Sequence, residues 1–412
     1  MMKRNTILSI ELALLAAFSL CAVARAQVEP AAVGASAKLD YDFGYSQTAD
    51  IYAGYDVPQE RGIASGEIEY LNGHARTPLN LMYSGGYIAG ISGKGSGTGF
   101  FQHLMISQGY QARSWSTTLK EELNFYPESP TTGFSGIPGV GILPGLPGQG
   151  DQPILSLNTL SLYNAVTATF MHTINYDTTF SVDGNYTSVR FPDGGGFDVN
   201  EVGVRPQVRW RLNALNSASV QYVFNRSNYL GSPFVIDTES VQPGLMHVWN
   251  RRLTTSASVG PEWTRSNNNF FIPPSTGIAA NGEIVYTGRS LSASANYYRS
   301  VSAGAGLGTQ IGIRNNDANA GVSRTFGRDL TIGATASYMN TEGLVLTGVT
   351  NGEYGGVNVT RRFGEFITLS GSYTAIHQTS SLPLEANALK GLSQVIGFSI
   401  AYHPRETHII RK

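Results

Sequence analysis

The sequence predicts an all-β protein, a transmembrane antiparallel up-and-down β-barrel of about 18 strands (16–18) with short periplasmic turns and long extracellular loops. Three observations carry this prediction: an export signal, a composition poor in charge and rich in glycine and aromatic residues, and many segments in which polar and apolar residues alternate. Because only helices and closed barrels can satisfy their backbone inside lipid, an exported membrane chain without apolar helical spans is expected to form a barrel.

The N-terminus has the order of residues typical of a secretory signal peptide. "MMKRN" is basic, an apolar stretch follows from 7 to 24, and "ARA" (24–26) gives a small-x-small cleavage pattern before Gln27. The alternative is a lipoprotein signal ending at Cys21, but Leu20 stands where such signals want a small residue. We therefore expect a signal peptide (1–26), a periplasmic N-terminal segment (27–37), the barrel (38–403) and a periplasmic tail (404–412).

The composition excludes several classes of protein. Only 14% of the residues are charged, against about 25% in a typical soluble domain. Cleavage removes Lys3, Arg4 and Arg25 from 28 basic residues and Glu11 from 29 acidic residues, which leaves a net charge of −3 and favours no nucleic-acid partner. It also removes the lone cysteine, so the mature chain has no disulfide and no thiolate metal site.

Segments along the whole chain alternate apolar residues with Ser, Thr, Asn, Gln and Gly. A soluble protein of this size usually covers its wet face with Lys and Glu, whereas a transmembrane barrel is apolar outside and polar inside. The clearest examples are "LDYDFGYSQ" (39–47), "DTTFSVDGNYTSVRF" (177–191), "NSASVQYVFN" (216–225), "LTTSASVGPEW" (253–263), "LTIGATASY" (330–338) and "FITLSGSYT" (366–374).

The connections between these segments alternate in length, and short turns with long loops are typical of outer-membrane barrels, with the short turns periplasmic. Tight connections lie near 175–178, 213–216, 250–253, 288–290, 326–329 and 363–366. Longer polar connections lie at 192–198, 230–237, 267–280, 302–311, 342–351 and 379–391.

The same pattern places the strands in order along the chain. They are expected at 39–47, 64–73, 79–91, 100–111, 114–126, 159–175, 178–191, 198–213, 216–229, 237–250, 253–267, 280–288, 290–301, 311–326, 329–341, 351–363, 366–378 and 391–403. An even number of strands puts both termini on the side of the short turns.

The last strand, "SQVIGFSIAYHP", resembles the C-terminal strand motif of Gram-negative outer-membrane barrels. Ile396, Phe398, Ile400 and Tyr402 share one face, and Gly397 lies three residues before Ile400. The chain departs from the usual motif because "HPRETHIIRK" follows the aromatic residue. The resemblance, which extends to porin-like barrels, implies an integral outer-membrane protein, alone or as a homo-oligomer, with lipid and the barrel-assembly machinery as partners and Gly397, Phe398, Ile400 and Tyr402 as the assembly signal.

The segment "GVRPQVRWRLN" (203–213) has one basic face and one apolar face in a strand. Its apolar residues would face lipid, and its basic face would line the lumen opposite an acidic lane on the first two strands. Two interpretations of the basic face are open. It selects solutes, or Arg209 and Arg211 merely line the periplasmic mouth. The lumen candidates are Arg205, Gln207, Arg209, Arg211, Asp40, Asp42, Glu67, Glu69 and Glu262.

A long connection, 127–157, breaks the rhythm because it is rich in glycine and proline and unusually apolar. Long loops without secondary structure are generally functional or disordered. Such a loop narrows the lumen from inside, packs against neighbouring loops or another subunit, or stays disordered. The constriction candidates are Phe134, Ile137, Val140, Ile142, Leu143 and Leu146.

Signals for catalysis are weak, and we expect neither an enzyme nor a cofactor nor a metal. "SGKGSGTG" (92–99) lacks the first glycine and the Ser or Thr of a phosphate-binding loop. The histidines show no spacing for a metal. His377 with Ser380 or Ser381 is the one candidate for a hydrolase site.

The sequence therefore predicts a porin-like channel in the cell outer membrane, through which small polar solutes or ions diffuse passively. Two alternatives remain open. The barrel exports a polymer such as an exopolysaccharide, or it is a structural or adhesive surface barrel that does not conduct.

Overall fold

The computed structural model describes residues 36–51, 59–73, 76–92, 98–126, 160–193, 196–302, 311–345, 348–381, 391–404 and 407–410. The predicted signal peptide and constriction loop lie outside these ranges. The strands are β1 (Ser36–Ile51), β2 (Gln59–Asn72), β3 (Leu79–Ser92), β4 (Gly99–Gln111), β5 (Trp115–Tyr126), β6 (Ser161–Thr173), β7 (Thr178–Arg190), β8 (Val199–Arg211), β9 (Asn216–Tyr229), β10 (Val235–Asn250), β11 (Leu253–Ser266), β12 (Ser275–Thr287), β13 (Leu291–Ser302), β14 (Ile313–Phe326), β15 (Leu330–Gly343), β16 (Val349–Phe363), β17 (Ile367–Ser380), β18 (Gly391–Tyr402) and β19 (Thr407–Ile410).

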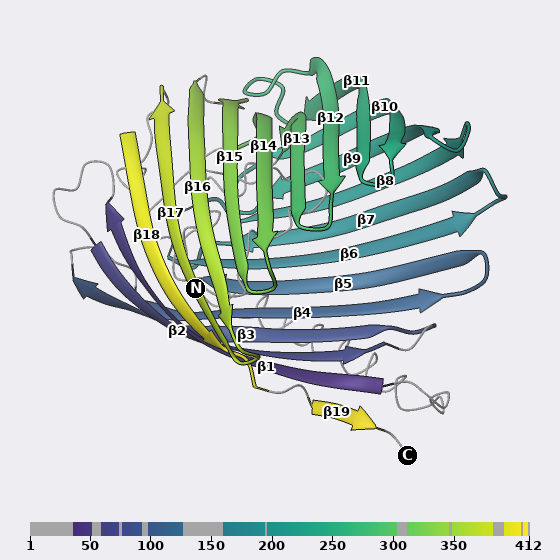
Figure 1. Ribbon diagram of the computed structural model, residues 1–412. Helices are drawn as coiled ribbons and strands as arrows, with labels where there is room; N and C mark the ends of the chain where they lie inside the picture. Colours follow the sequence, from purple (N-terminus) through teal and green to yellow (C-terminus); the bar gives the residue numbers. More distant parts are fainter. Residues whose placement is uncertain are drawn as a thin grey trace.

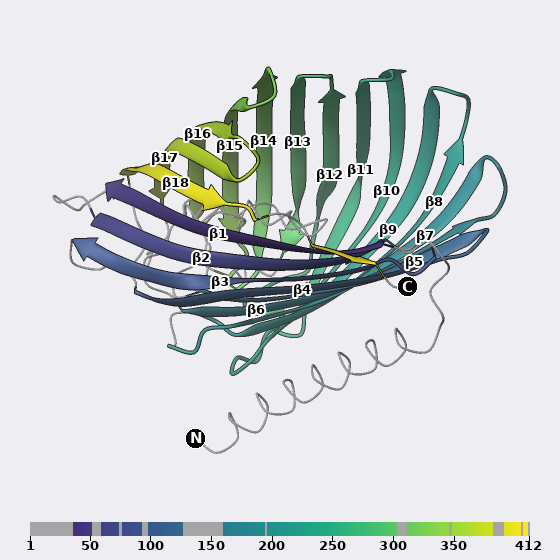
Figure 2. The ribbon, with the colours of Figure 1, turned by 60° about the horizontal axis from the view of Figure 1, so that its bottom comes forward.

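Strands β1 to β18 form one closed antiparallel barrel (Figures 1 and 2). Each strand pairs with the next in the chain, and β1 pairs with β18 from Phe43↔Tyr402 to Ile51↔Gln394. Closure leaves no free sheet edge, which is the condition for crossing lipid with strands. The predicted 18-strand up-and-down barrel is confirmed. Among the described residues, no helix has the length and hydropathy needed to cross a membrane.

The C-terminal tail contains a short additional strand. Strand β19 continues along β1 beyond the end of β18 and pairs with it from Ser36↔Ile410 to Leu39↔Thr407. It extends below the rest of the sheet in Figure 1. The segment expected as a periplasmic tail therefore pairs with the first residues of β1. The C-terminal strand motif in β18 does not predict this pairing.

The short turns owe their shape to asparagine and glycine. Asn213 Oδ1 accepts hydrogen bonds from the backbone N–H groups of Leu215 and Asn216, each at 2.9 Å. Asn175 and Asn250 make the same contacts in their own turns. This side-chain mimic of a backbone turn explains why Asn begins these connections. Gly327 and Gly364 each adopt φ 66°, a left-handed conformation that favours glycine.

Alternation along each strand separates a lumen face from an outer face. On β1, Phe43 is 56% exposed, whereas Ser46 and Asp50 are fully buried on the opposite face. On β8, Val202 and Trp210 lie on the exposed apolar face, and Arg205 lies on the other face with the recess described below. A barrel that is apolar outside and polar inside is the architecture of outer-membrane proteins.

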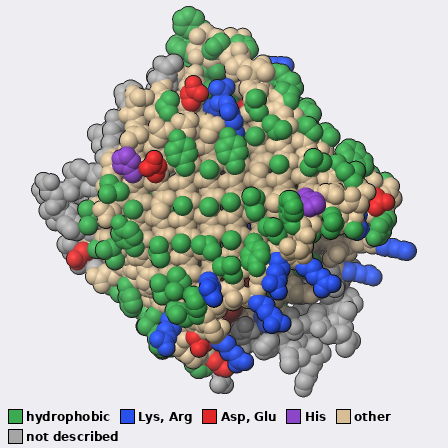
Figure 3. Space-filling model, turned by 45° about the horizontal axis from the view of Figure 1, so that its top comes forward, with side chains coloured by type: hydrophobic (Ala, Val, Ile, Leu, Met, Phe, Trp, Pro, Cys, Tyr) green, Lys and Arg blue, Asp and Glu red, His purple; other side chains and the backbone are tan. Residues whose placement is uncertain are grey.

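The outer face carries rows of hydrophobic side chains, with charged side chains mainly above and below them (Figure 3). At the periplasmic end, Tyr110 stacks on Trp115 with ring centroids 5.0 Å apart. Arg324 lies over the ring of Phe326 and Arg361 over that of Phe363. Aromatic rings and snorkelling cations at one level are typical of a membrane–water interface.

Cysteine labelling at the two ends of the barrel tests its orientation in the membrane. Cysteines introduced at Asn269, in the long β11–β12 connection, and at Ser380, the last residue of β17, are expected to react with an impermeant maleimide in intact cells. A cysteine at Arg328, in a short turn, is expected to react only after the outer membrane is opened. The opposite pattern of labelling would contradict the orientation.

Candidate functional site: a polar recess in the barrel lumen

A polar recess opens on the lumen side of the wall formed by β6 to β13. Most of its lining side chains are neutral hydrogen-bonding groups, and it contains one arginine and two carboxylates. The lining side chains are Thr167, Thr169, Asp183, Asn185, Arg205, Gln221, Val223, Asn225, Thr238, Ser240, Gln242, Glu262, Asn281, Tyr298 and Ser300.

Two asparagine side chains meet over a glycine in the upper part of the recess. The strand registers place Asn185 opposite Gly203, and Gly203 opposite Asn225. A Cβ on Gly203 would lie 2.2 Å from Asn185 Oδ1 and 2.5 Å from Asn225 Oδ1. A side chain at this position would displace both amides, so the glycine lets them lie side by side.

Below the asparagines, hydrogen bonds fix a charged pair and a glutamine pair. Arg205 Nη2 lies 3.0 Å from Asp183 Oδ2, and Thr169 Oγ1 donates to the other oxygen of Asp183 at 2.9 Å. Gln221 Nε2 donates to Gln242 Oε1 at 2.8 Å. Preset rotamers of this kind reduce the entropy lost when a solute binds.

Glu262 closes one side of the recess. Its side chain is buried, and its Oε2 accepts a hydrogen bond of 3.1 Å from the backbone N–H of Val301. That N–H is available because the pairing of β12 with β13 ends at Ala280↔Arg299. A Cβ on Gly277 would lie 3.7 Å from Glu262 Oε1 and 3.6 Å from Arg314 Nη2, so a cation flanks the buried carboxylate.

An apolar cluster lies above the recess, inside the extracellular mouth. It joins buried residues at the ends of β7 to β10 to residues of five long connections. The apolar cluster consists of Val189, Phe191, Val199, Tyr229, Ile236, Ile272 and Ile311, with Tyr163, Phe234, Leu344 and Val345 packed against it.

Tyr229 and Gly312 hold this cluster together. Tyr229 is 1% exposed, and its hydroxyl oxygen accepts a hydrogen bond of 2.7 Å from the Gly312 N–H. Gly312 has φ 66°, and a Cβ there would lie 2.6 Å from Ile236 Cδ1. The β13–β14 connection can approach β10 this closely because it has glycine at this position.

The predicted acidic lane lies near the periplasmic mouth. The register sets Asp42 opposite Glu67, and Asp40 opposite Glu69, which places like charges side by side. His403 Nδ1 contacts Asp42 Oδ1, and Asn80 Nδ2 donates to Glu69 Oε1 at 3.0 Å.

The structure divides the predicted basic lane of β8 between two places. Arg205 lies in the recess, whereas Arg209 and Arg211 follow it toward the short turn at 213–216. Arg211 donates to Tyr176 Oη at 3.1 Å and to the backbone oxygen of Asn213 at 3.3 Å. Gln207 lies opposite Gln221, between the two places. Whether this lane selects solutes or only lines the mouth stays a prediction.

The remaining predicted residues lie away from the recess, apart from Glu262. Phe398, Ile400 and Tyr402 are exposed on the outer face of β18, as an apolar lipid-facing strand requires. Gly397 lies on the lumen face, where a Cβ would be 2.7 Å from Ser372 Oγ. The constriction candidates from Phe134 to Leu146 lie outside the described residues, so their role stays a prediction.

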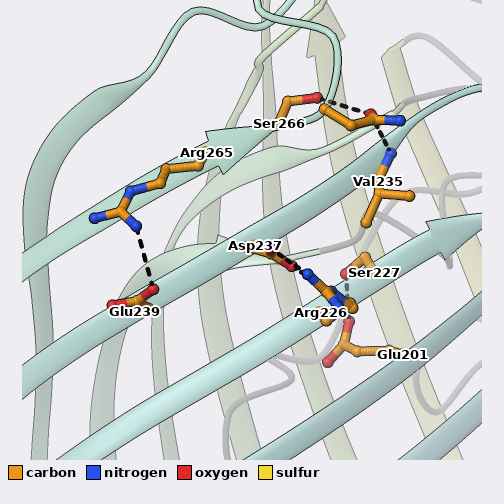
Figure 4. A network of polar contacts seen from close by, with 9 residues as sticks. Glu201, Arg226, Ser227, Val235, Asp237, Glu239, Arg265 and Ser266 are labelled. Carbon is orange, nitrogen blue, oxygen red and sulfur yellow. Dashed lines mark hydrogen bonds and ion pairs between the residues drawn. The ribbon is translucent and has the colours of Figure 1, made fainter.

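Ion pairs mark the extracellular end of the outer face on β9 to β11 (Figure 4). Arg226 donates from Nε and Nη2 to the two carboxylate oxygens of Asp237, both at 2.7 Å. Arg265 Nη1 lies 3.8 Å from Glu239 Oε1. Because an ionised group is costly on a lipid face, these pairs mark the upper limit of the apolar band.

The candidate hydrolase residues are not brought together. His377 lies on the outer face and contacts Glu353, with 3.8 Å between Nδ1 and Oε2, whereas Ser380 is an odd number of residues away on the opposite face. Ser381 Oγ is hydrogen-bonded to the backbone of Val349. Within the described ranges, no group of three His, Cys, Asp or Glu side chains is placed to hold a metal.

Sequence reasoning missed the Asn185–Gly203–Asn225 arrangement and the apolar cluster. The alternation places each of these asparagines on a lumen face, but which residues are neighbours depends on the register between strands. The cluster had a signal in the chain, because Ile272, Ile311 and Leu344 belong to apolar positions within otherwise polar connections.

No protein-family model matches the chain, and no curated protein matches it in sequence. Solved structures match it in fold. OccK5 (OpdH) of Pseudomonas aeruginosa is 9% identical, with 91% of this chain and 98% of that chain covered and a TM-score of 0.48. OccK2 (OpdF) of the same organism is 10% identical, with the same coverage and TM-score. A bacterial polysaccharide outer-membrane secretin is 8% identical, with 89% and 98% covered and a TM-score of 0.37. The similarity of these proteins to the chain is one of fold alone.

Proposed function

We propose that the protein is an outer-membrane channel through which small polar solutes diffuse passively. The observation that carries the proposal is the polar recess inside a closed barrel whose outer face is apolar. A lumen filled by a packed core would show apolar side chains on both faces of each strand, whereas here the recess wall is lined with amides and hydroxyls. Such groups replace part of the hydration shell of a polar solute as it passes.

The arrangement of charges in the lumen supports the diffusion of polar solutes through the barrel. The acidic pairs on β1 and β2 lie seven and six strands away from the arginines at the end of β8, on different sides of the periplasmic mouth. Opposed charges in a lumen with low-dielectric walls create a field that orders polar solutes. Screening over about 8 Å at physiological salt confines this effect to narrow parts of the channel.

Planar-bilayer recording tests the proposal. The purified barrel is expected to add conductance in discrete steps, with a matched preparation that lacks the protein as the control. Liposomes that contain the barrel are expected to swell in isotonic solutions of small sugars. A folded barrel that gives neither steps nor swelling would contradict the proposal.

The second candidate is a structural or adhesive barrel with a closed lumen, and the apolar cluster favours it. Eleven side chains from the wall and from long connections fill part of the extracellular mouth. A closed barrel would give no steps in the bilayer, and deletion of its gene would reduce attachment of cells to surfaces.

A further inference from the structure

The recess offers hydrogen bonds rather than charge. Its arginine is paired with Asp183, at 3.0 Å between Arg205 Nη2 and Asp183 Oδ2. The remaining carboxylate, Glu262, is buried, hydrogen-bonded to Val301 N and flanked by Arg314 across Gly277. Among the described residues, the recess therefore presents no uncompensated cation that would attract an anionic solute.

Free amide groups point into the same space. The side chains of Asn185 and Asn225 line the recess, and neither is hydrogen-bonded to any other described residue. Each amide supplies two N–H donors and one acceptor oxygen. A carboxylate or an ammonium group would use only one half of this set, whereas a hydroxyl group both donates and accepts.

The shape of the lining adds an aromatic surface to the amides. Tyr298 lines the recess from β13, and its hydroxyl lies 2.6 Å from Ser300 Oγ. A tyrosine combines an apolar ring with a polar hydroxyl, a pair that suits a molecule with C–H bonds on one side and hydroxyls on its rim. Sugars combine these two properties.

We infer that the recess is a binding site for a neutral polyhydroxylated solute, a sugar in its uncharged form, held by the Asn185 and Asn225 amides. This inference rests on the proposed channel function, since it names the class of solute for which the recess is a station. Binding is weak and reversible, because a solute that is held tightly cannot leave the channel.

Three probes that share one ring test the inference: glucose, glucuronate and glucosamine. The folded barrel in detergent is titrated with each, and binding is followed by saturation-transfer difference NMR. Glucose is expected to give a saturable signal and to bind more tightly than both charged analogues. Replacing Asn185 and Asn225 with alanine together is expected to raise the half-saturating glucose concentration about tenfold or more, the loss expected for two net hydrogen bonds.

The matched control is a second lumen pair of asparagines. Asn319 Nδ2 donates to Asn296 Oδ1 at 3.0 Å on β14 and β13, and neither residue lines the recess. The double variant Asn296→Ala/Asn319→Ala is expected to bind glucose within about twofold of the native protein, because these two side chains lie on strands well separated from β7 and β9, which carry the Asn185 and Asn225 amides. Heat-modifiable migration in gels checks that each variant is folded. If the asparagine variant of the recess is not folded, Gln221→Ala replaces it, with the same expected direction.

Each outcome has a separate meaning. Tighter binding of glucuronate or glucosamine than of glucose, unchanged binding in the recess variant, or no saturable signal from any sugar would overturn the inference. Glucose binding by a barrel that never conducts would support the recess and contradict the channel. Conductance without sugar binding would support the channel and contradict the sugar site in the recess.

Discussion

Replacing Phe398 with arginine is expected to abolish most of the assembled barrel. Phe398 lies on the outer face of β18 with 54% of its side chain exposed, opposite Gln47 on β1 and Gly371 on β17. A charge at this depth on the lipid face costs about 2–4 kcal/mol. That corresponds to a folding equilibrium about 30-fold to 1,000-fold less favourable. Heat-modifiable barrel in outer-membrane fractions measures the result.

The adjacent residue supplies the control. Ser399 lies on the lumen face of the same strand, opposite Ser46 and Ser370. Arginine at this position would extend into a polar lumen, so Ser399→Arg is expected to assemble at close to the native level. Equal losses from both substitutions would show that the lipid face of β18 is not the reason for the defect.

Replacing Tyr229 with alanine is expected to loosen the apolar cluster and widen the extracellular mouth. The substitution removes a fully buried aromatic ring, a change that typically costs about 3–5 kcal/mol in a packed core. It also removes the hydroxyl that accepts from Gly312 N. If the proposed channel function holds, single-channel conductance is expected to rise about twofold or more.

Tyr229→Phe is the graded control, because it keeps the ring and removes only the hydrogen bond. Loss of this hydrogen bond costs about 1 kcal/mol of stability. The conductance of Tyr229→Phe is therefore expected to lie close to that of the native protein. A folded Tyr229→Ala variant with native conductance would mean that the apolar cluster does not limit the flow.

The sequence predicts the fold well because closed barrels repeat one local rule. Alternation places Phe43 outside and Asp42 inside without knowledge of any distant residue, and the Asn213 turn identifies the periplasmic side. The order of strands then follows from the chain, since each hairpin pairs neighbours. The site is harder, because its residues come from strands whose mutual register the alternation does not determine.

The recess and the apolar cluster show why the register matters. Asn185, Gly203 and Asn225 form one row only because three strands are aligned to the residue, and a shift by two positions would keep every side chain on its face. Gly312 reaches Tyr229 across 83 residues of sequence. Hydrophobic periodicity carries no information at that range, so it does not predict the contact between Gly312 and Tyr229.

The seam between β1 and β18 has a consequence for the order in which the barrel can form. His403 meets Asp42 across 361 positions of the chain, and β19 lies beside the first residues of β1. These contacts form only after the last strand has joined the barrel. Because Ser36 and Ile410 pair at one end of this seam, a circular permutant that joins the first and last strands and opens a long extracellular connection would keep all the strand pairs of the barrel. In the closed barrel every strand of such a permutant keeps both of its neighbours, so a failure to insert would report on how the chain is delivered and closed.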